Sequence, residues 1–287
     1  MIKVKNLSKK YGNVPAVKNI SFNVKEGSIY GFLGPNGAGK STTMNMICGC
    51  LAITDGTVTV NGHDIVDEAV EAKACIGYLP EIPPLYPDMT VFEYLEFVAM
   101  AKGLRGEALY DDLSYCMDKT GITDVADRLI KNLSKGFKQR VGIAQAIVGD
   151  PHVVILDEPT VGLDPLQILE IRNLIKELGE EHTVIISSHI LQEIEAVCDR
   201  VIMISKGRIV ADAALADLTK NETLEQAFVR LAGESIDAGV AYATEIREEK
   251  LSQKEARRGK VKIITESKKG AAYYEEIYVD EEPEEKK

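Results

Sequence analysis

The sequence has no tryptophan and only five cysteines, and no apolar run in it approaches the ~20 residues of a membrane-spanning helix. The cysteines are odd in number and scattered, and the nearest two, Cys48 and Cys50, lack the paired spacing of a zinc site. We interpret all five as reduced thiols that mostly serve packing. The first residues, MIKVKNLSKKYG, lack an apolar core of signal-peptide length. These absences predict a cytosolic chain that reaches a membrane only when another protein carries it there.

Basic residues are also fewer than acidic ones. The chain has 34 Lys and Arg against 45 Asp and Glu, which gives a formal net charge of -11. A general nucleic-acid binder is more often basic, because neutralising phosphates supplies most non-specific affinity. We therefore expect no nucleic-acid partner. The length of 287 residues suits one large domain, or one domain with an appendage.

Short apolar strands alternate with helices along most of the chain. The segments 28–34, 74–79, 152–157 and 183–188 have the pattern of buried strands, and helical patterns follow most of them. Two further segments, 57–65 and 200–212, have the turn signals of hairpins. This alternation predicts an α/β fold with a mostly parallel sheet covered on both faces. Helical spacing without strands from about 88 to 148 predicts an inserted helical subdomain.

The composition changes after residue 232. Glu, Lys and Arg dominate from Glu245 onward, which is typical of a solvated, partly disordered tail. Two short patches, VKIITE and EEIYVD, could instead pair as strands of a small module. We therefore expect a main domain over residues 1–232 and a charged C-terminal extension over 233–287, either regulatory or merely solubilising.

The stretch GPNGAGKS, Gly34 to Ser41, fits a phosphate-binding loop. Glycines let backbone N–H groups turn inward around phosphate oxygens, and the helix that follows presents its positive end. Lys40 would reach the β and γ phosphates, and the Ser41 hydroxyl would bind Mg²⁺. The predicted nucleotide contacts in this loop are Gly34, Pro35, Asn36, Gly37, Ala38, Gly39, Lys40, Ser41 and Thr42.

The strand VVILDEP, from Val153 to Pro159, ends in two acids. Beside a phosphate loop, Asp157 would hold the Mg²⁺ shell and Glu158 would polarise an attacking water. Taken alone the pattern is weak, because apolar strands often end in acids. A phosphate loop in the same chain makes the functional interpretation convincing.

Between these two motifs lies LSKGFKQRVGIAQAI, Leu133 to Ile147. Ser134 would cap a helix and Gly136 would free backbone amides at its start, which together favour a second anion site. The plainer alternative is a capped helix and nothing more. The order of the motifs favours the functional interpretation. The phosphate loop is followed by LSKGF, LDEPTVGLDP and SSH, and over residues 1–232 this order resembles that of the ATP-binding subunits of ABC transporters.

The resemblance implies a P-loop NTPase core of mostly parallel sheet with an antiparallel β subdomain and the helical insertion. It also implies that two such subunits, identical or different, face each other and hold ATP between one phosphate loop and the other's signature. Ser134, Lys135 and Gly136 would then act in trans on the γ-phosphate, and Asp164 would contact the partner. Glu158 would be the catalytic glutamate.

Two further residues take roles from the same resemblance. His189 matches the switch histidine that senses the γ-phosphate, although a satisfied histidine at a strand end would otherwise be the default interpretation. Tyr11 lies where the family places an aromatic ring on adenine, but an exposed tyrosine in a strand more often packs.

Two departures from the family pattern narrow the resemblance to one subgroup of the family. The signature has Lys135 and Phe137 where LSGGQ has glycine and glutamine, and Glu81 replaces the usual Q-loop glutamine. Both variants resemble a bacterial subgroup of ABC-2 type exporters. We expect the Mg²⁺ ligands to be Ser41, Glu81 and Asp157, and we hypothesise that Lys135, arriving in trans, offsets the charge of Glu81.

The stretch that contains Glu81, GYLPEIPPLYPDMT, has four prolines that fix φ and donate no backbone hydrogen bond. It should therefore form a semi-rigid link from the α/β core into the helical insertion, with Glu81 at the core-side end.

These observations predict an Mg²⁺-dependent ATPase, attached to integral membrane permease subunits at the cytoplasmic face of the cell membrane. The alternatives are a non-transport ABC-type ATPase, a P-loop kinase or GTPase, and a regulatory switch without turnover. No [NT]-K-x-D stretch for reading guanine is present, and a kinase or GTPase would leave LSKGF unexplained. The retention of Glu158 and His189 argues against a switch without turnover.

Overall fold

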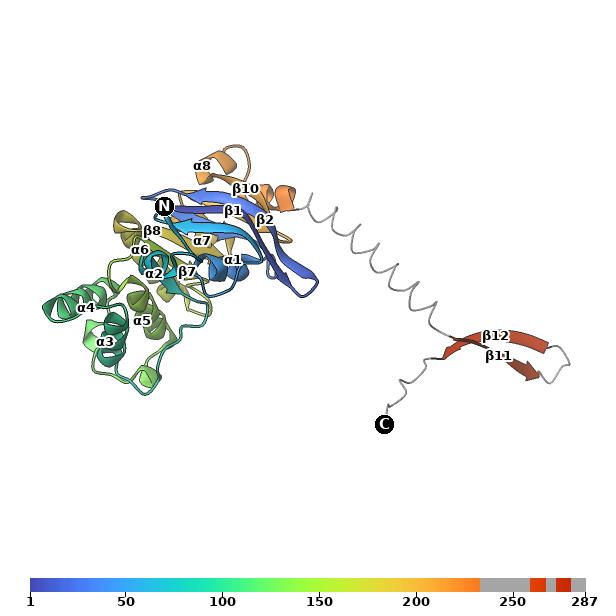
Figure 1. Cartoon of the computed structure of the whole chain (residues 1–287), viewed down its shortest axis with the longest axis horizontal. Coiled ribbons are helices and arrows are strands. Elements are labelled where there is room, and N and C mark those ends of the chain that lie inside the picture. Colours follow the sequence, from blue (N-terminus) through green and yellow to red (C-terminus); the bar gives the residue numbers. More distant parts are fainter. Residues whose placement is uncertain (233–258, 267–271, 280–287) are drawn as a thin grey trace. The chain divides into compact units, whose positions relative to one another are not determined.

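The computed structural model describes residues 1–232 and, beyond them, only the strands at 259–266 and 272–279 (Figure 1). The chain divides into two compact units, Met1–Gly233 and Glu234–Lys287. In the second unit β11 (Gly259–Glu266) pairs with β12 (Ala272–Val279) in an antiparallel hairpin. The two strand patches expected in the extension therefore do pair, and its other predicted features lie outside the described residues.

The first unit is built on a six-stranded sheet in the order β10-β9-β3-β8-β7-β6. All neighbours are parallel except β10, which is antiparallel to β9. The strands are β3 (Ile29–Leu33), β6 (Ile76–Leu79), β7 (Val153–Asp157), β8 (Thr183–Ser188), β9 (Arg200–Ser205) and β10 (Arg208–Ala214). Because parallel strands are buried on both faces, β3 and β7 have no exposed residue.

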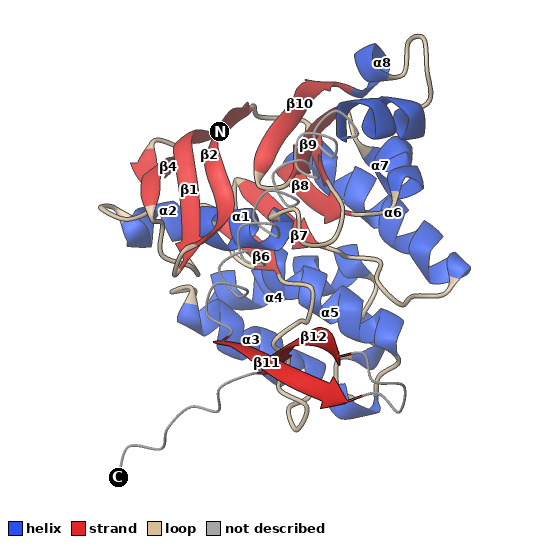
Figure 2. Cartoon of the chain, turned by 90° about the vertical axis from the view of Figure 1, so that its right-hand side faces the viewer, coloured by secondary structure: helices blue, strands red, loops and turns tan. Residues whose placement is uncertain are grey.

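A second, antiparallel sheet has the order β2-β1-β4-β5. Its strands are β1 (Ile2–Tyr11), β2 (Val14–Val24), β4 (Asp55–Val60) and β5 (His63–Asp64). Alternate residues of β2, namely Ile20, Phe22 and Val24, are buried and form one hydrophobic cluster with Tyr30 and Phe32 of β3. Helix α1 (Lys40–Ile47) contributes to this cluster and contacts both sheets, as Figure 2 shows.

The other face of the six-stranded sheet is covered by helices. Alternation along β7 sends Val153 and Ile155 toward the antiparallel sheet, and Val154 and Leu156 toward these helices. Outside the insertion, α6 (Pro165–Glu181) and α7 (Leu191–Val197) pack on this face, and α8 (Leu215–Leu218) and helical residues 224–232 follow β10. Helix α2 (Ala69–Ala74), like α1, packs instead on the side of the antiparallel sheet, through Ala72. The predicted α/β fold with an antiparallel β subdomain is confirmed.

Between β6 and β7 the described chain is helical, as the sequence predicts. The insertion contains α3 (Val91–Ala101), α4 (Glu107–Thr120), the 3₁₀ turns Thr123–Val125 and Ile130–Asn132, and α5 (Lys135–Ile147). Thr90 begins α3 with a capping box, in which its hydroxyl accepts from the Glu93 amide and the Glu93 carboxylate accepts from the Thr90 amide. The proline-rich stretch from Pro80 to Thr90 joins neither sheet nor helix, because its prolines donate no backbone hydrogen bond.

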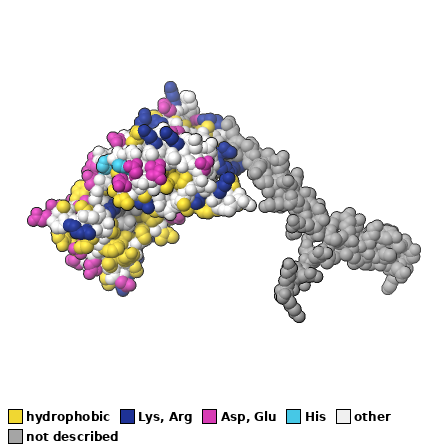
Figure 3. All heavy atoms as spheres, viewed as in Figure 1, with side chains coloured by type: hydrophobic (Ala, Val, Ile, Leu, Met, Phe, Trp, Pro, Cys, Tyr) yellow, Lys and Arg dark blue, Asp and Glu magenta, His cyan; other side chains and the backbone are white. Residues whose placement is uncertain are grey.

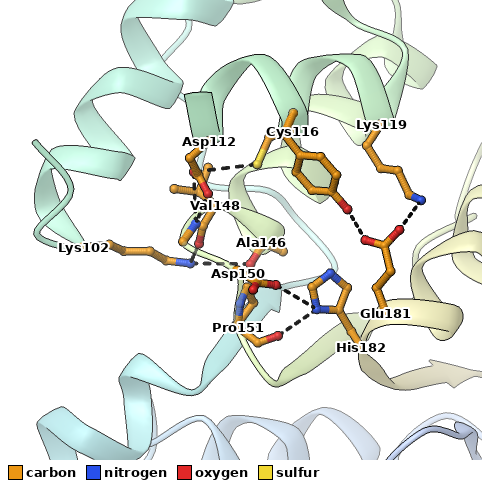
Figure 4. A network of polar contacts seen from close by, with 12 residues as sticks. Lys102, Asp112, Cys116, Lys119, Ala146, Val148, Asp150, Pro151, Glu181 and His182 are labelled. Carbon is orange, nitrogen blue, oxygen red and sulfur yellow. Dashed lines mark hydrogen bonds and ion pairs between the residues drawn. The ribbon is translucent and has the colours of Figure 1, made fainter. Parts of the chain in front are cut away.

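A polar network fastens the insertion to the sheet core (Figure 4). At one end, the Lys102 ammonium donates to the carbonyl of Val148, and the Gly149 amide donates to the Asp112 carboxylate. Burial lowers the pKa of Lys102. At the other end, the hydroxyl of Tyr115 donates to Glu181.

Two further contacts complete this end of the network. The Lys119 ammonium lies 2.9 Å from Oε1 of Glu181, at the end of α6. Nearby, the Nδ1–H of His182 donates to the Pro151 carbonyl at 2.8 Å. These contacts connect α4 to the carboxyl end of α6 and to the start of β7 and β8.

The described residues include no helix long and apolar enough to cross a membrane.

Glu181 should make stability depend on pH. The hydrogen bond from Tyr115, and then that from Lys119, lower the pKa of this carboxyl. Its contribution to the free energy of unfolding is therefore present above the unfolded-state pKa of about 4.3 and is lost as pH falls through the folded-state pKa. Because the carboxylate is largely exposed, we expect Glu181→Gln to lower the unfolding free energy at pH 7 by less than about 1 kcal/mol. Urea unfolding at several pH values measures this.

The matched control is Glu180→Gln, which changes the adjacent exposed glutamate on the same helix. It should leave the pH profile of the unfolding free energy unchanged. An equal effect of Glu181→Gln at pH 7 and pH 3 would contradict the linkage.

Candidate functional site

The loop Gly34 to Gly39 connects β3 to α1 at the carboxyl end of the parallel sheet. Gly37 and Gly39 have φ of 78° and 107°, in the left-handed region that favours glycine. Gly34 is needed for another reason, since a Cβ there would lie 2.4 Å from the Ile204 carbonyl. The loop is therefore shaped by its glycines into a curve that ends at the positive end of α1.

Lys40, the first residue of α1, points into the site rather than into solvent. Its side chain is only 6% exposed, and its ammonium donates to the Gly34 carbonyl at 2.8 Å. The same ammonium lies 3.4 Å from Oε1 of Glu158, whose side chain is 8% exposed. A buried charge of each sign thus faces the other, with hydrogen bonds offsetting part of the desolvation cost.

Glu158 follows directly after β7 and has a backbone φ of 51°, unusual for a residue with a side chain. Its amide donates to Ser187, to the carbonyl at 3.1 Å and the hydroxyl at 3.2 Å. Oε2 of its carboxylate lies 2.9 Å from Nδ1 of His189. Glu158 is therefore the centre of a Lys40–Glu158–His189 chain of contacts.

Asp157, the last residue of β7, lies one step deeper. It is paired in register with Ser187 of β8 and accepts a hydrogen bond from the Ser187 hydroxyl. Both residues are almost completely buried. Ser187 thus holds the Asp157 carboxylate through its hydroxyl, and the Glu158 amide through its carbonyl and hydroxyl. The SSH motif did not indicate this role.

A cavity of about 390 Å³ collects most of the predicted site residues. It is lined by Ala16, Pro35, Asn36, Gly37, Gly39, Lys40, Ser41, Thr42, Glu81, Glu158, Val161 and His189. Ala16 and Val161 were not predicted, and no sequence signal distinguishes them from ordinary apolar residues. Five segments that are separated in the sequence therefore converge on one cavity.

Some predicted residues do not line this cavity. Gly34 and Ala38 are buried in the loop itself, and Asp157 lies behind it. Tyr11 ends β1 with 51% of its surface exposed, and the Lys9 ammonium lies 5.4 Å from its ring centroid. The role of Tyr11 toward adenine stays a prediction.

The signature residues lie apart from the phosphate loop of their own chain. Ser134 caps α5, its hydroxyl accepting from the Phe137 amide at 3.3 Å, as the sequence predicts. A Cβ on Gly136 would lie within 3.0 Å of the Gln167 side chain, so this glycine allows α5 and α6 to approach closely. Ser134 and Gly136 line a separate small cavity beside α6. Within one chain the structure does not bring the signature to the phosphate loop.

Lys135 takes a position that the sequence did not predict. It lines, with Glu81, a second cavity of about 370 Å³ between the proline-rich stretch and α5. Its ammonium covers Gly162, where a Cβ would lie 2.0 Å from Nζ. The sequence predicts that Lys135 approaches Glu81 of a partner in trans, and this role stays a prediction; within one chain the two residues already line one cavity, because the start of α5 packs beside that stretch.

Asp164, the predicted partner contact, begins α6. Its carboxylate accepts from the Gln167 amide at 2.9 Å, and Pro165 occupies the first helical position. Its side chain is exposed and available at the surface.

The donor set of the larger cavity suits a hard cation. Ser41 offers a hydroxyl, and Glu81 and Glu158 offer carboxylates. Within the described residues no three His, Cys, Asp or Glu side chains gather as a metal site. Two carboxylates and a hydroxyl suit Mg²⁺, which proteins usually bind through one or two carboxylates while phosphates and water complete its shell.

Comparisons with known proteins agree with this geometry. The family model described as ABC transporter matches residues 17–161. The bacitracin transport ATP-binding protein BcrA of Bacillus licheniformis is 39% identical over 77% of this chain and 72% of its own length.

Two solved structures are similar as well. One, of the ATP-binding subunit of an ABC transporter, covers 80% of this chain and 99% of its own at a TM-score of 0.73 and 32% identity. The other is the dimeric post-hydrolysis state of the ATP-binding cassette MJ0796 bound to ADP and Pi. It covers 75% of this chain and 99% of its own, with a TM-score of 0.68 and 29% identity.

Proposed function

The chain belongs to the ABC transporter family as an ATP-binding subunit and is an ATPase, and we propose that it powers an ABC-2 type exporter from the cytoplasmic face of the cell membrane. The observation that carries the proposal is the convergence of Lys40, Ser41, Glu81, Glu158 and His189 on one cavity. Phosphate-binding, acid–base and charge-sensing groups meet there at the carboxyl ends of parallel strands.

The phosphate loop would hold the nucleotide by its backbone N–H groups and the positive end of α1. Lys40 would exchange its contact with Glu158 for the β and γ phosphates, whose charge is larger than that of one carboxylate. Glu158 would then be free to accept a proton from the attacking water. His189, 2.9 Å from Glu158, would hold that carboxylate and report the γ-phosphate.

Ser41, Glu81 and Asp157 would hold Mg²⁺, directly or through water, and the ion would neutralise charge that develops on the phosphates. Asp157 is kept in place by the Ser187 hydroxyl.

A second nucleotide-binding subunit, a copy of this chain or a related one, would complete the site. In one chain Ser134 and Gly136 lie at a separate cavity, so they are available to the nucleotide of the partner. Asp164 lies exposed at the start of α6, where it would contact that partner. ATP binding would close the dimer, and hydrolysis would reopen it.

The surface of the insertion supports a membrane partner. Exposed apolar side chains gather there, as Figure 3 shows over the helical insertion. Ile82 is 82% exposed, and Phe97 and Met100 of α3 are 45% and 43% exposed. Tyr86, in the proline-rich stretch, packs against α3 with its ring centroid 5.6 Å from that of Phe97. Exposed apolar groups of this kind favour protein contacts.

The export direction is supported by the Glu81 and LSKGF variants, which resemble the ABC-2 subgroup, and by the relative named for bacitracin transport. The cargo is left unassigned.

Glu158→Gln tests the catalytic site. The amide cannot act as a base, so we expect kcat for ATP hydrolysis to fall by about 100-fold or more. ATP binding should persist, because the phosphate loop and Lys40 remain. Phosphate release and nucleotide binding by the full chain measure the two properties. Glu177→Gln, which changes an exposed glutamate on α6, is the control. Equal hydrolysis by Glu158→Gln and the unchanged chain would exclude the proposed base.

Phe97→Asp tests attachment to a permease. A charge in the exposed aromatic group should weaken binding to the membrane subunits encoded by neighbouring genes by more than about tenfold, while the ATPase rate of the isolated chain stays unchanged. Co-purification from membranes measures the binding. Val70→Asp, at a residue of α2 that is 79% exposed, is the control outside the insertion. Undiminished co-purification of Phe97→Asp would argue against this docking surface.

Glu81 and Lys135 should be energetically coupled. Because both line one cavity, removing either charge should change the activation free energy of hydrolysis by an amount that depends on the other. We expect a coupling of at least about 0.5 kcal/mol from a cycle of Glu81→Gln, Lys135→Met and the double variant. Lys138→Met, at another lysine of this cavity, is the control for Lys135. Additive changes in the activation free energy would show that the two charges act independently.

A further inference from the structure

Glu193 is a buried carboxylate with no part in the chemistry proposed above. It lies on α7 with only 4% of its surface exposed. It does not line the phosphate cavity and so would not touch the nucleotide. Burying a carboxylate is costly unless hydrogen bonds replace its water, so its partners indicate what it does.

Both carboxylate oxygens of Glu193 accept hydrogen bonds. The Thr160 hydroxyl donates to Oε1 at 2.5 Å, and the Ser188 hydroxyl donates to Oε2 at 2.9 Å. The Ser188 oxygen itself accepts from the Ile190 amide at 3.0 Å, so its proton is directed toward Glu193. The short Thr160 contact lies in the range of charge-assisted O–H···O⁻ bonds.

The two hydroxyls belong to the two loops that carry the proposed catalytic pair. Thr160 follows Glu158 by two residues in the loop between β7 and α6, and Ser188 is the last residue of β8, directly before His189. Thr160 and Ser188 are almost completely buried, at 4% and 1% exposed. Glu193 thus bridges the loops behind the Glu158–His189 contact.

We propose that Glu193 is a positioning residue that fixes the distance between Glu158 and His189 by holding Thr160 and Ser188 together. This inference rests on the roles proposed for Glu158 and His189. Without this bridge, β7 and β8 still pair in register and the Glu158 amide still donates to Ser187. No contact on the buried side would then fix the distance between the two loops. Catalytic groups are sensitive to such shifts, because a misplacement of about 1 Å can reduce a rate by about 100-fold.

The test compares full-length variants in steady-state ATP hydrolysis. Glu193→Gln keeps the size of the side chain but turns one acceptor into a donor that faces a hydroxyl. We expect kcat to fall by about 10- to 100-fold, with KM for ATP within about twofold, because the phosphate loop is untouched. Thr160→Val, which removes one donor, should behave in the same way. Thr160→Ser, which keeps the hydroxyl, should restore most of the rate.

Glu195→Gln is the matched control, since Glu195 is an exposed glutamate of the same helix, and it should leave both constants unchanged. The Thr160→Ser and Thr160→Val pair separates positioning from folding, because valine keeps the shape of threonine without the hydroxyl, whereas serine keeps the hydroxyl without the methyl group. Melting temperatures of all variants are measured alongside.

An unchanged kcat in Glu193→Gln, equal rates in Thr160→Ser and Thr160→Val, or a loss that appears only in KM would overturn the inference. The proposed function is tested separately by Glu158→Gln. If Glu158→Gln abolishes hydrolysis and Glu193→Gln does not, only the positioning role falls. If Glu158→Gln hydrolyses ATP at the full rate, the proposed catalytic pair falls, and the role of Glu193 falls with it.

Discussion

Three parallel strands, β3, β7 and β8, end at the same edge of one sheet, and the contact chain of Lys40, Glu158 and His189 depends on this alignment. The register pairs Asp157 with Ser187 and places the residues after each strand next to one another. Lys40 follows the loop after β3, Glu158 follows β7, and His189 follows β8. A shift of one residue in a strand would reverse the direction of its side chains and separate these groups. Apolar alternation on both faces of the strands fixes the register and, through it, the site.

The proline-rich stretch connects this edge of the sheet to the surface of the helical insertion. Its core-side residue, Glu81, lines both larger cavities, and its Tyr86 packs between Tyr94 and Phe97 of α3. The stretch makes few backbone hydrogen bonds but is confined by its prolines and by these rings. The insertion is in turn tied to the core at its far side, where α4 meets α6. The described part of the insertion is thus held at two places, one near the nucleotide cavity and one remote from it.

Much of this arrangement was predictable from the sequence, because a glycine-rich strand-to-helix turn and a later apolar strand that ends in acids together indicate a phosphate site, although the acids alone would not. The phosphate loop, the Asp157–Glu158 pair and the Ser134 cap depend on local chemistry, and each is found where the sequence places it. Ser187 and Glu193 were not predictable, since a serine in a strand and a glutamate in a helix show nothing of the partner that packing brings to them. The cavity that Lys135 shares with Glu81 within one chain was not predictable, because the packing of α5 beside the proline-rich stretch is a tertiary contact. Tyr11 depends on a ligand that its own surroundings do not define.

The buried contact between Lys40 and Glu158 gives the protein an internal competitor for its nucleotide. The ammonium that would bind the phosphates is already satisfied by a carboxylate at 3.4 Å, so nucleotide binding is an exchange of partners rather than a simple gain. The measured affinity for ATP would then report the difference between two ion pairs, and it would vary with salt less steeply than the charge of ATP suggests. The same exchange couples nucleotide occupancy to catalytic competence. Glu158 would be free to accept a proton only after a phosphate has taken its place beside Lys40.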